Sequence, residues 1–252
     1  MKLEDYEKMH PSSVIEHGGR RILFNTPNRQ TAWRAETLFT KEPDTIAWIG
    51  DFAESEVLLD IGANVGMYSV FAAATRGVTV YAFEPESQNY SLLNRNIHDN
   101  GLADRVFAFC VALSDTTSFH RLYLSQFIPG GSCHNFGEPV DYRGQALKSP
   151  FVQGAFSTTV DELIAQGAMP VPTHVKIDVD GIEPKVMAGA KATLRDKRVR
   201  SLLIEINTNL DSHWEIIDWM LESGFDYDLR QADAGRREKG AFEGVGNYVF
   251  RR

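Results

Sequence analysis

Cysteine is scarce in this chain of 252 residues, which contains only Cys110 and Cys133. Neither thiol has a partner at metal-ligand spacing, and two cysteines do not make a disulfide scaffold. Long apolar runs are absent too, because no stretch approaches the roughly 20 residues that span a bilayer. The N-terminal stretch MKLEDYEKMHPSS is charged and has no apolar signal core. We therefore expect a cytoplasmic protein with no membrane partner.

An excess of positive charge is also missing. Lysine and arginine number 26 against 34 aspartate and glutamate residues, so the formal net charge is −8 and the isoelectric point is near 5.4. Such a chain is poorly suited to broad electrostatic binding of nucleic acid or anionic lipid. The short basic cluster from Lys197 to Arg200 fits solvated residues around the start of a strand. We expect a small molecule, and no nucleic acid, as the partner.

Apolar residues make up 43% of the chain, which is enough for a sizeable α/β core. From residue 55 on, apolar runs of strand length alternate with segments of helical periodicity. This alternation predicts a mostly parallel sheet with helices on both faces. The predicted strands are 56–61, 78–85, 105–113, 174–180, 199–206, 225–231 and 246–251. The predicted helices are 66–77, 87–101, 182–196 and 213–224.

Two segments depart from the alternation, and they divide the chain into an N-terminal extension, residues 1–54, and a main domain, residues 55–252. The extension has strand character at 22–24 and helical character at 31–39 and 42–53. Residues 115–158 are rich in glycine and polar side chains, which predicts an irregular loop that covers the substrate. The polar stretch 232–245 is unsuited to a crossover helix, so we expect the last two strands to pair antiparallel.

A glycine turn, Gly62 to Gly66, follows the first strand of the main domain. It lacks the lysine by which a P-loop holds phosphates. It also lacks the middle glycine of a dinucleotide turn, because Asn64 fills that position. Asp60 at the strand end would repel phosphate, whereas an acid beside a helix N-terminus suits a ligand with an ammonium group and a carboxylate. S-adenosylmethionine carries both groups.

Glu84 ends the second strand, where an acid can accept hydrogen bonds from both hydroxyls of a ribose. NAD sites use the same device, so an NAD-dependent oxidoreductase on a Rossmann sheet is an alternative. A cofactor-binding fold that serves as a non-catalytic module is another. Asp60, Asn64 and Glu84 together favour S-adenosylmethionine.

Five segments resemble, in combination, the FkbM-type S-adenosylmethionine-dependent methyltransferases. They are VLLDIGANVGMYS, VYAFEPESQNYSLLNRNIHDNG, VALSD, HVKIDVDGIEPKVMAGA and LLIEI, within roughly residues 55 to 207. The resemblance implies the Rossmann-like class I methyltransferase fold, a seven-stranded sheet with one antiparallel strand. It also implies methylation of hydroxyl oxygens on sugars, polyketides and related secondary metabolites.

The motifs and the resemblance together give an expected cofactor site. The turn would hold the amino-acid end of the cofactor and Glu84 the ribose, and the resemblance places adenine at the end of the third strand. For Tyr68, burial within its helix is an equal alternative. The expected set is Asp60, Gly62, Ala63, Asn64, Gly66, Tyr68, Ser69, Glu84, Pro85, Ala112, Leu113, Ser114 and Asp178.

Acidic residues supply most of the catalytic candidates. Asp178 and Asp180 share a face if the fourth strand runs regularly that far, and Glu205 ends the fifth strand. Two neighbouring acids raise the pKa of one of them, which suits a general base, and Lys176 could neutralise one acid. The three acids could instead bind Mg²⁺. His134 is the fourth candidate, although a lone loop histidine is more often solvated.

The acceptor molecule is not identified by the sequence. We expect the loop from Ser125 to Gly144 and the segment from Arg29 to Arg34 to shape its pocket. Trp33 and Trp48 of the N-terminal extension could serve a homodimer interface as easily as a pocket lid.

Overall fold

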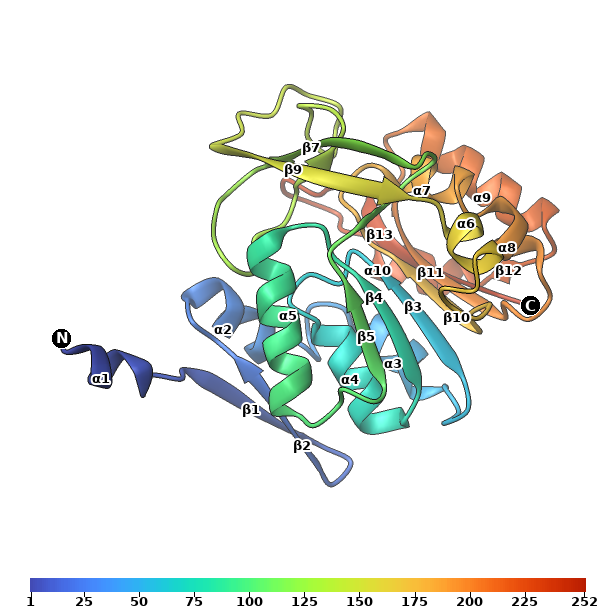
Figure 1. The fold of residues 1–252 in the computed structure, drawn as a ribbon. Coiled ribbons are helices and arrows are strands. Elements are labelled where there is room, and N and C mark those ends of the chain that lie inside the picture. The colour runs from blue at the N-terminus through green and yellow to red at the C-terminus, as the bar shows by residue number, and fades with distance from the viewer.

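A seven-stranded sheet forms the centre of the computed structural model, which describes residues 1–252 (Figure 1). Its strand order is β12-β13-β11-β10-β3-β4-β5, and β13 alone is antiparallel to its neighbours. The predicted mostly parallel sheet with one antiparallel strand is therefore confirmed. The strands are β3 (Val57–Ile61), β4 (Thr79–Phe83), β5 (Val106–Phe109), β10 (His174–Ile177), β11 (Ser201–Asn207), β12 (Asp226–Tyr227) and β13 (Val245–Arg251).

Helices cover both faces of this sheet, as the alternation predicts. Adjacent residues of β3 show why: Leu58 and Leu59 are both fully buried, but they belong to opposite cores. One core includes α4 (Met67–Arg76) and α5 (Ser87–Asp99). The other includes α6 (Val160–Ala165), α7 (Glu183–Ala188), α8 (Lys191–Arg195) and α9 (Asp211–Glu222). Burial on both sides is what makes the strands continuous apolar runs in the sequence.

The N-terminal segment packs on the α4 and α5 side of the sheet (Figure 1). Ile22 and Phe24 of its hairpin are buried in that core, as is Trp48. A reciprocal cap between Asn28 and Thr31 begins the second helix. The segment consists of α1 (Leu3–Glu7), β1 (Ser12–His17), β2 (Arg20–Asn25), α2 (Arg29–Glu36) and α3 (Pro43–Gly50).

The expectation of an irregular loop over residues 115–158 is wrong, because much of this segment forms a second sheet. It has four strands in the order β6-β9-β7-β8: β6 (Ala112–Leu113), β7 (Ser118–Leu124), β8 (Asn135–Phe136) and β9 (Phe151–Thr158). β7 and β9 pair antiparallel from Ser118 opposite Ser157 to Leu124 opposite Phe151. The predicted third strand is accordingly split, since its last two residues leave the main sheet and pair with β9.

Two further elements differ from the prediction. The helix expected over 182–196 is interrupted at Gly189, where a Cβ atom would lie 2.0 Å from the backbone oxygen of Ser114. The strand expected over 225–231 is shorter and gives way to α10 (Leu229–Gly235), whose first turn is capped by the Asp228 side chain. The last two strands pair antiparallel as expected. None of the helices combines the length and the apolar character that crossing a bilayer requires.

Candidate active site

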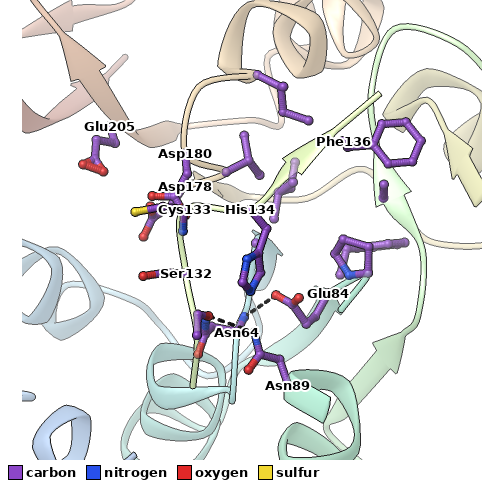
Figure 2. A pocket seen from close by; sticks show the side chains of 18 of the residues that line it. Asn64, Glu84, Asn89, Ser132, Cys133, His134, Phe136, Asp178, Asp180 and Glu205 are labelled. Carbon is purple, nitrogen blue, oxygen red and sulfur yellow. Dashed lines mark hydrogen bonds between the residues drawn. The ribbon is translucent and has the colours of Figure 1, made fainter. Parts of the chain in front are cut away.

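A cavity of about 490 Å³ opens at the carboxyl ends of β3, β4, β10 and β11. This is where ligands bind in open α/β sheets, and the volume is in the usual range for small-molecule sites. Figure 2 shows Asn64 and Glu84 on one side, Asp178, Asp180 and Glu205 on the other, and His134 between them. The expected site residues that line the cavity are Gly62, Asn64, Glu84, Pro85, Ala112, Leu113, His134, Asp178, Asp180 and Glu205.

The glycine turn approaches β10 so closely that it needs a residue without a side chain. A Cβ atom on Gly62 would lie 1.9 Å from the backbone oxygen of Asp178, and the φ of Gly62 is +78°. Asn64 also has a positive φ, 52°, and its Nδ2 donates to the backbone oxygen of Gly131 at 2.7 Å. The side chain of Asn64, at the position of the middle glycine of a dinucleotide turn, therefore connects the turn to the segment around Gly131.

Asp60 lies beneath the turn and does not line the cavity. Its side chain is 1% exposed, and Ser69 Oγ donates to its Oδ2 at 2.5 Å. Burial raises the pKa of Asp60, although the Lys176 ammonium group and the Ser69 hydroxyl act in the opposite direction. The expected residues Gly66, Ser69 and Ser114 also line neither the cavity nor the recess beside it, so the structure does not place them in contact with a ligand there.

Glu84 is held by the backbone on both sides of its carboxyl group. The N–H of Asn64 donates to Oε2 at 2.8 Å, and the N–H of Glu86 donates to Oε1 at 2.9 Å. Burial raises the pKa of Glu84 to about 7 despite these two hydrogen bonds. The carboxyl group is thus fixed in orientation and titrates near neutral pH.

Asp178 is the acid that stays ionised. The Nζ atom of Lys176 lies 3.0 Å from Asp178 Oδ2 and 3.9 Å from Asp60 Oδ1, and the lysine side chain is 2% exposed. Burial alone would raise the pKa of Asp178, but Lys176 and then Lys41 outweigh it and hold that pKa at about 2. A carboxylate with so low a pKa is a weak base and a good partner for a positive charge.

Asp180 and Glu205 have the opposite character. β10 ends at Ile177 and not at Asp180 as predicted, so the condition for Asp178 and Asp180 to share a strand face is not met, and Asp180 has a φ of +56°. Oxygen atoms of Asp178, Asp180 and Glu205 nonetheless lie within 4.8 Å of one another. Burial and then the Asp178 charge raise the pKa of Asp180. The same two causes raise the pKa of Glu205 well above its usual value.

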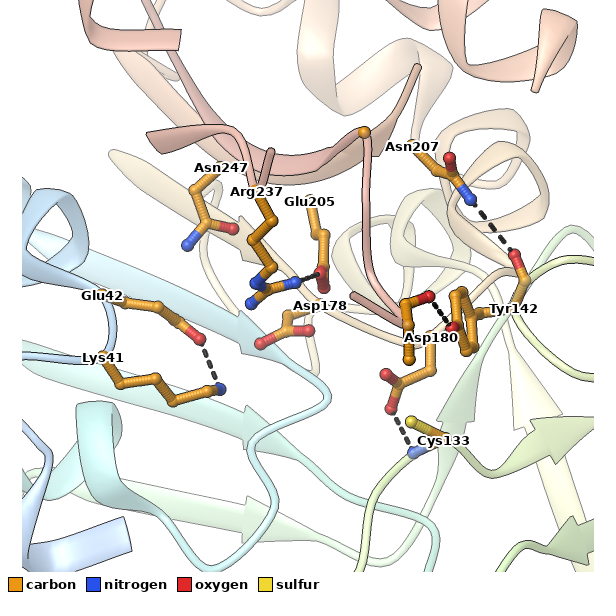
Figure 3. A network of polar contacts seen from close by, with 12 residues as sticks. Lys41, Glu42, Cys133, Tyr142, Asp178, Asp180, Glu205, Asn207, Arg237 and Asn247 are labelled. Carbon is orange, nitrogen blue, oxygen red and sulfur yellow. Dashed lines mark hydrogen bonds and ion pairs between the residues drawn. The ribbon is translucent and has the colours of Figure 1, made fainter. Parts of the chain in front are cut away.

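Further contacts fix this acidic cluster in place (Figure 3). The N–H of Cys133 donates to Asp180 Oδ2 at 2.7 Å, and Arg237 Nη1 donates to Glu205 Oε2 at 3.2 Å. Asp178 already pairs with Lys176 and Glu205 with Arg237, and these ion pairs disfavour binding of Mg²⁺. That the three acids bind Mg²⁺ stays a prediction. The predicted alternative base, His134, accepts at Nδ1 from the N–H of Ser125, and burial lowers its pKa to about 4.

A small recess adjoins the cavity at the start of α4. Ala63 and Tyr68 of the expected set line it, together with Arg34, Lys41, Lys176 and Asp178. Gln30, Trp33 and Arg34 also line the main cavity, as expected for the segment around Arg29 to Arg34. Lys41, Arg237 and Phe242 also line the cavity but were not predicted, because no local motif marks them and only the folding of distant segments brings them to the site.

The chain is similar in sequence to known methyltransferases. The sequence model of the family described as Methyltransferase FkbM domain matches residues 60–227. The hexuronic acid methyltransferase AglP of Haloferax volcanii is 25% identical over 198 residues, which are 79% of this chain and 75% of that protein. The 31-O-demethyl-FK506 methyltransferase FkbM of Streptomyces tacrolimicus is 25% identical over 194 residues, which are 68% of this chain and 72% of that protein.

A solved structure also has the same fold. It is the methyltransferase FkbM from Methylobacillus flagellatus KT, with a TM-score of 0.53 and 17% identity. The alignment covers 80% of this chain, and the chain spans 44% of the length of that structure.

Proposed function

The chain belongs to the FkbM family of S-adenosylmethionine-dependent methyltransferases, and on that premise we propose that it methylates a hydroxyl oxygen of a small metabolite such as a sugar or a polyketide. One observation carries the proposal: a single cavity has a cofactor-type wall, with Asn64 and Glu84, opposite the acidic cluster of Asp178, Asp180 and Glu205. The two relatives, a hexuronic acid methyltransferase and a 31-O-demethyl-FK506 methyltransferase, support a hydroxylated acceptor.

The residues present fit the cofactor. The fixed carboxyl group of Glu84 would accept from the ribose hydroxyls, and the apolar side chains of Pro85, Ala112 and Leu113 would contact the adenine. The recess presents the charged groups of Arg34 and Asp178 together, which matches the zwitterionic end of an amino acid. A pyrophosphate does not fit as well, because the side chain of Asn64 occupies the position of the glycine that lets a pyrophosphate approach the backbone.

Asp178 and Asp180 of the acidic cluster would have different roles in methyl transfer. Bound S-adenosylmethionine supplies a methyl group on a sulfonium leaving group. In the proposed reaction the acceptor oxygen would displace the sulfur from the methyl carbon, and the sulfur would keep the electron pair of the broken bond. The hydroxyl proton passes to the carboxylate of Asp180, whose raised pKa suits a general base. Asp178, which Lys176 keeps ionised, would face the positive charges of the cofactor.

Calorimetry tests the cofactor assignment. We expect the protein to bind S-adenosylmethionine and S-adenosylhomocysteine but not NAD, because the turn has no place for a pyrophosphate. Binding of NAD alone would overturn the proposal in favour of an oxidoreductase. Tight binding of S-adenosylmethionine without methyl transfer to any of a panel of hydroxylated sugars and polyketides would instead favour a non-catalytic module.

The affinity for S-adenosylhomocysteine is expected to depend on pH through Glu84. Ribose hydroxyls donate to the ionised carboxylate, so binding favours the deprotonated form of a group whose pKa is about 7 in the free protein. The dissociation constant should therefore be nearly constant above pH 8 and rise by up to about tenfold per unit below pH 7. Titration calorimetry between pH 5.5 and pH 8.5, a range of about three units, measures the profile.

Glu84→Gln is the control for this profile, because the amide does not titrate in this range. We expect the variant to bind at least about tenfold more weakly at pH 8 and to lose the dependence on pH. A variant that keeps the wild-type profile would show that another group titrates and would remove Glu84 from the ribose site.

A further inference from the structure

The recess at the start of α4 contains a cation that the protein itself leaves without an acidic partner. Four basic residues line the cavity or the recess: Arg34, Lys41, Lys176 and Arg237. Lys41 pairs with Glu42 at 2.5 Å, Lys176 pairs with Asp178 at 3.0 Å and Arg237 pairs with Glu205 at 3.2 Å. Arg34 forms no ion pair.

The guanidinium group of Arg34 is nevertheless held in place. Its Nε donates to the backbone oxygen of Gly130 at 2.9 Å, and this is its one hydrogen bond within the protein. Gly130 is fixed in turn, since its N–H donates to Asn89 Oδ1 at 2.7 Å and a Cβ atom there would lie 2.8 Å from Thr31 Cγ2. Both terminal nitrogen atoms of Arg34 are thus left available on a group whose orientation is already set. Such a fork matches the two oxygens of a carboxylate.

The first turn of α4, which also contributes to the recess, has unused donors of its own. The backbone N–H groups of Met67, Tyr68 and Ser69 donate to no protein acceptor, and α4 is ten residues long. Free amides at a helix N-terminus attract a negative group. The positive charge of Arg34 acts on the same region, because it lowers the pKa of Asp178 and opposes the rise in the pKa of Tyr68.

We propose that Arg34 binds the α-carboxylate of the methionine part of S-adenosylmethionine. The free N–H groups at the start of α4 would donate to the same carboxylate, and Asp178 would bind the ammonium group. The assignment rests on the proposed function. It places an essential cofactor contact in the N-terminal segment, outside residues 60–227, which the family model matches. The N-terminal segment is then part of the cofactor site and not only a cover for the acceptor.

The experiment compares two ligands that differ at this end. S-adenosylhomocysteine carries the amino-acid group, whereas 5′-methylthioadenosine lacks it but keeps the adenine and the ribose. We expect Arg34→Met to weaken binding of S-adenosylhomocysteine at least about tenfold and to leave binding of 5′-methylthioadenosine unchanged. Arg29→Met, on the same helix but exposed and away from the cavity, is the matched control and should affect neither ligand.

The outcomes separate the inference from its premise. Unchanged affinity of Arg34→Met for S-adenosylhomocysteine would overturn the inference. Equal weakening of both ligands would also overturn it, because it would show that Arg34 acts by holding the segment around Gly130. A wild-type protein that binds neither ligand would overturn the proposed function itself and the inference with it.

Discussion

Lys176→Met is expected to lower the free energy of unfolding by about 3–5 kcal/mol, because it leaves the buried carboxylate of Asp60 without a cation and removes the nearest cation from the partly exposed Asp178. Lys176 is 2% exposed and lies between Asp60, which is 1% exposed, and Asp178. Asp60 has no second cation to turn to, and one of its oxygen atoms already lacks a hydrogen-bond partner. A loss of this size is a large part of the total stability of a typical domain.

The effect is measured by chemical unfolding and by the midpoint of thermal unfolding. For a chain of this length the midpoint should fall by about 6–20 °C, at about 2–4 °C per kcal/mol. Lys185→Met is the matched control, since Lys185 pairs with Glu138 on the surface at 2.8 Å. An exposed pair contributes under about 1 kcal/mol, so the control should unfold almost like the wild type.

The dependence on pH gives a second test with a definite sign. In the wild type the pKa of Asp178 is about 2, against an ordinary value of 3.8, so its contribution to stability is complete above pH 3.8 and is lost as the pH falls toward 2. In Lys176→Met we expect burial to raise the pKa of Asp60 further and that of Asp178 above its wild-type value, because the Lys176 charge no longer opposes it, so protonation relieves the cost of these acids. The stability gap between variant and wild type should therefore narrow from pH 7 to pH 5.

A gap that stays constant over this range would show that lost packing, and not unpaired charge, explains the loss. Replacing Asp60 by Asn in the Lys176→Met background should restore part of the stability, because it removes the buried carboxylate for which Lys176 is the only cation. No recovery in the double variant would argue against Asp60 as a partner of Lys176.

The sequence was sufficient for the parts of the fold that local patterns encode. Strands and helices alternate after residue 55, and the sheet is covered on both faces. Leu58 and Leu59 are therefore buried in opposite cores, and the sequence shows this burial as a continuous apolar run. The second sheet was not predictable in this way. Its strands β7 and β9 pair residues as distant as Ser118 and Ser157, and no local signal announces a partner that far along the chain. Likewise, only the packed structure shows that the helix is interrupted at Gly189, where the backbone lies too close to Ser114 for a side chain.

The candidate site, like the fold, could be predicted from the sequence only in part. Residue types and spacing selected Glu84, Asp178, Asp180 and Glu205, and the fold brings all four to one cavity. What the sequence could not assign is the charge state of each acid, because that depends on neighbours from other elements. Lys176 keeps Asp178 ionised, whereas burial beside Asp178 raises the pKa of Asp180. The sequence predicted that one acid of the Asp178 and Asp180 pair would have a raised pKa, and only the structure assigns that role to Asp180.

Asp180→Asn is expected to lower kcat by about 10²–10⁴-fold, the usual contribution of a positioned general base. The amide cannot accept the hydroxyl proton. The change should otherwise be mild, because asparagine tolerates the φ of +56° and can still accept from the N–H of Cys133. The measurement follows transfer of a labelled methyl group from S-adenosylmethionine to an acceptor found by screening hydroxylated metabolites. Asp115→Asn, at an exposed position outside the cavity, is the control.

A base of raised pKa also predicts the shape of the rate profile. Turnover by the wild type should rise with pH on the acid side as Asp180 loses its proton, and Asp180→Asn should lose that limb while the dissociation constant for S-adenosylhomocysteine stays near the wild-type value. If Asp180→Asn instead keeps most of the activity and Glu205→Gln loses it, the proton passes to Glu205. That result would mean that Arg237, 3.2 Å from Glu205, lowers the pKa of that acid enough to make it the base.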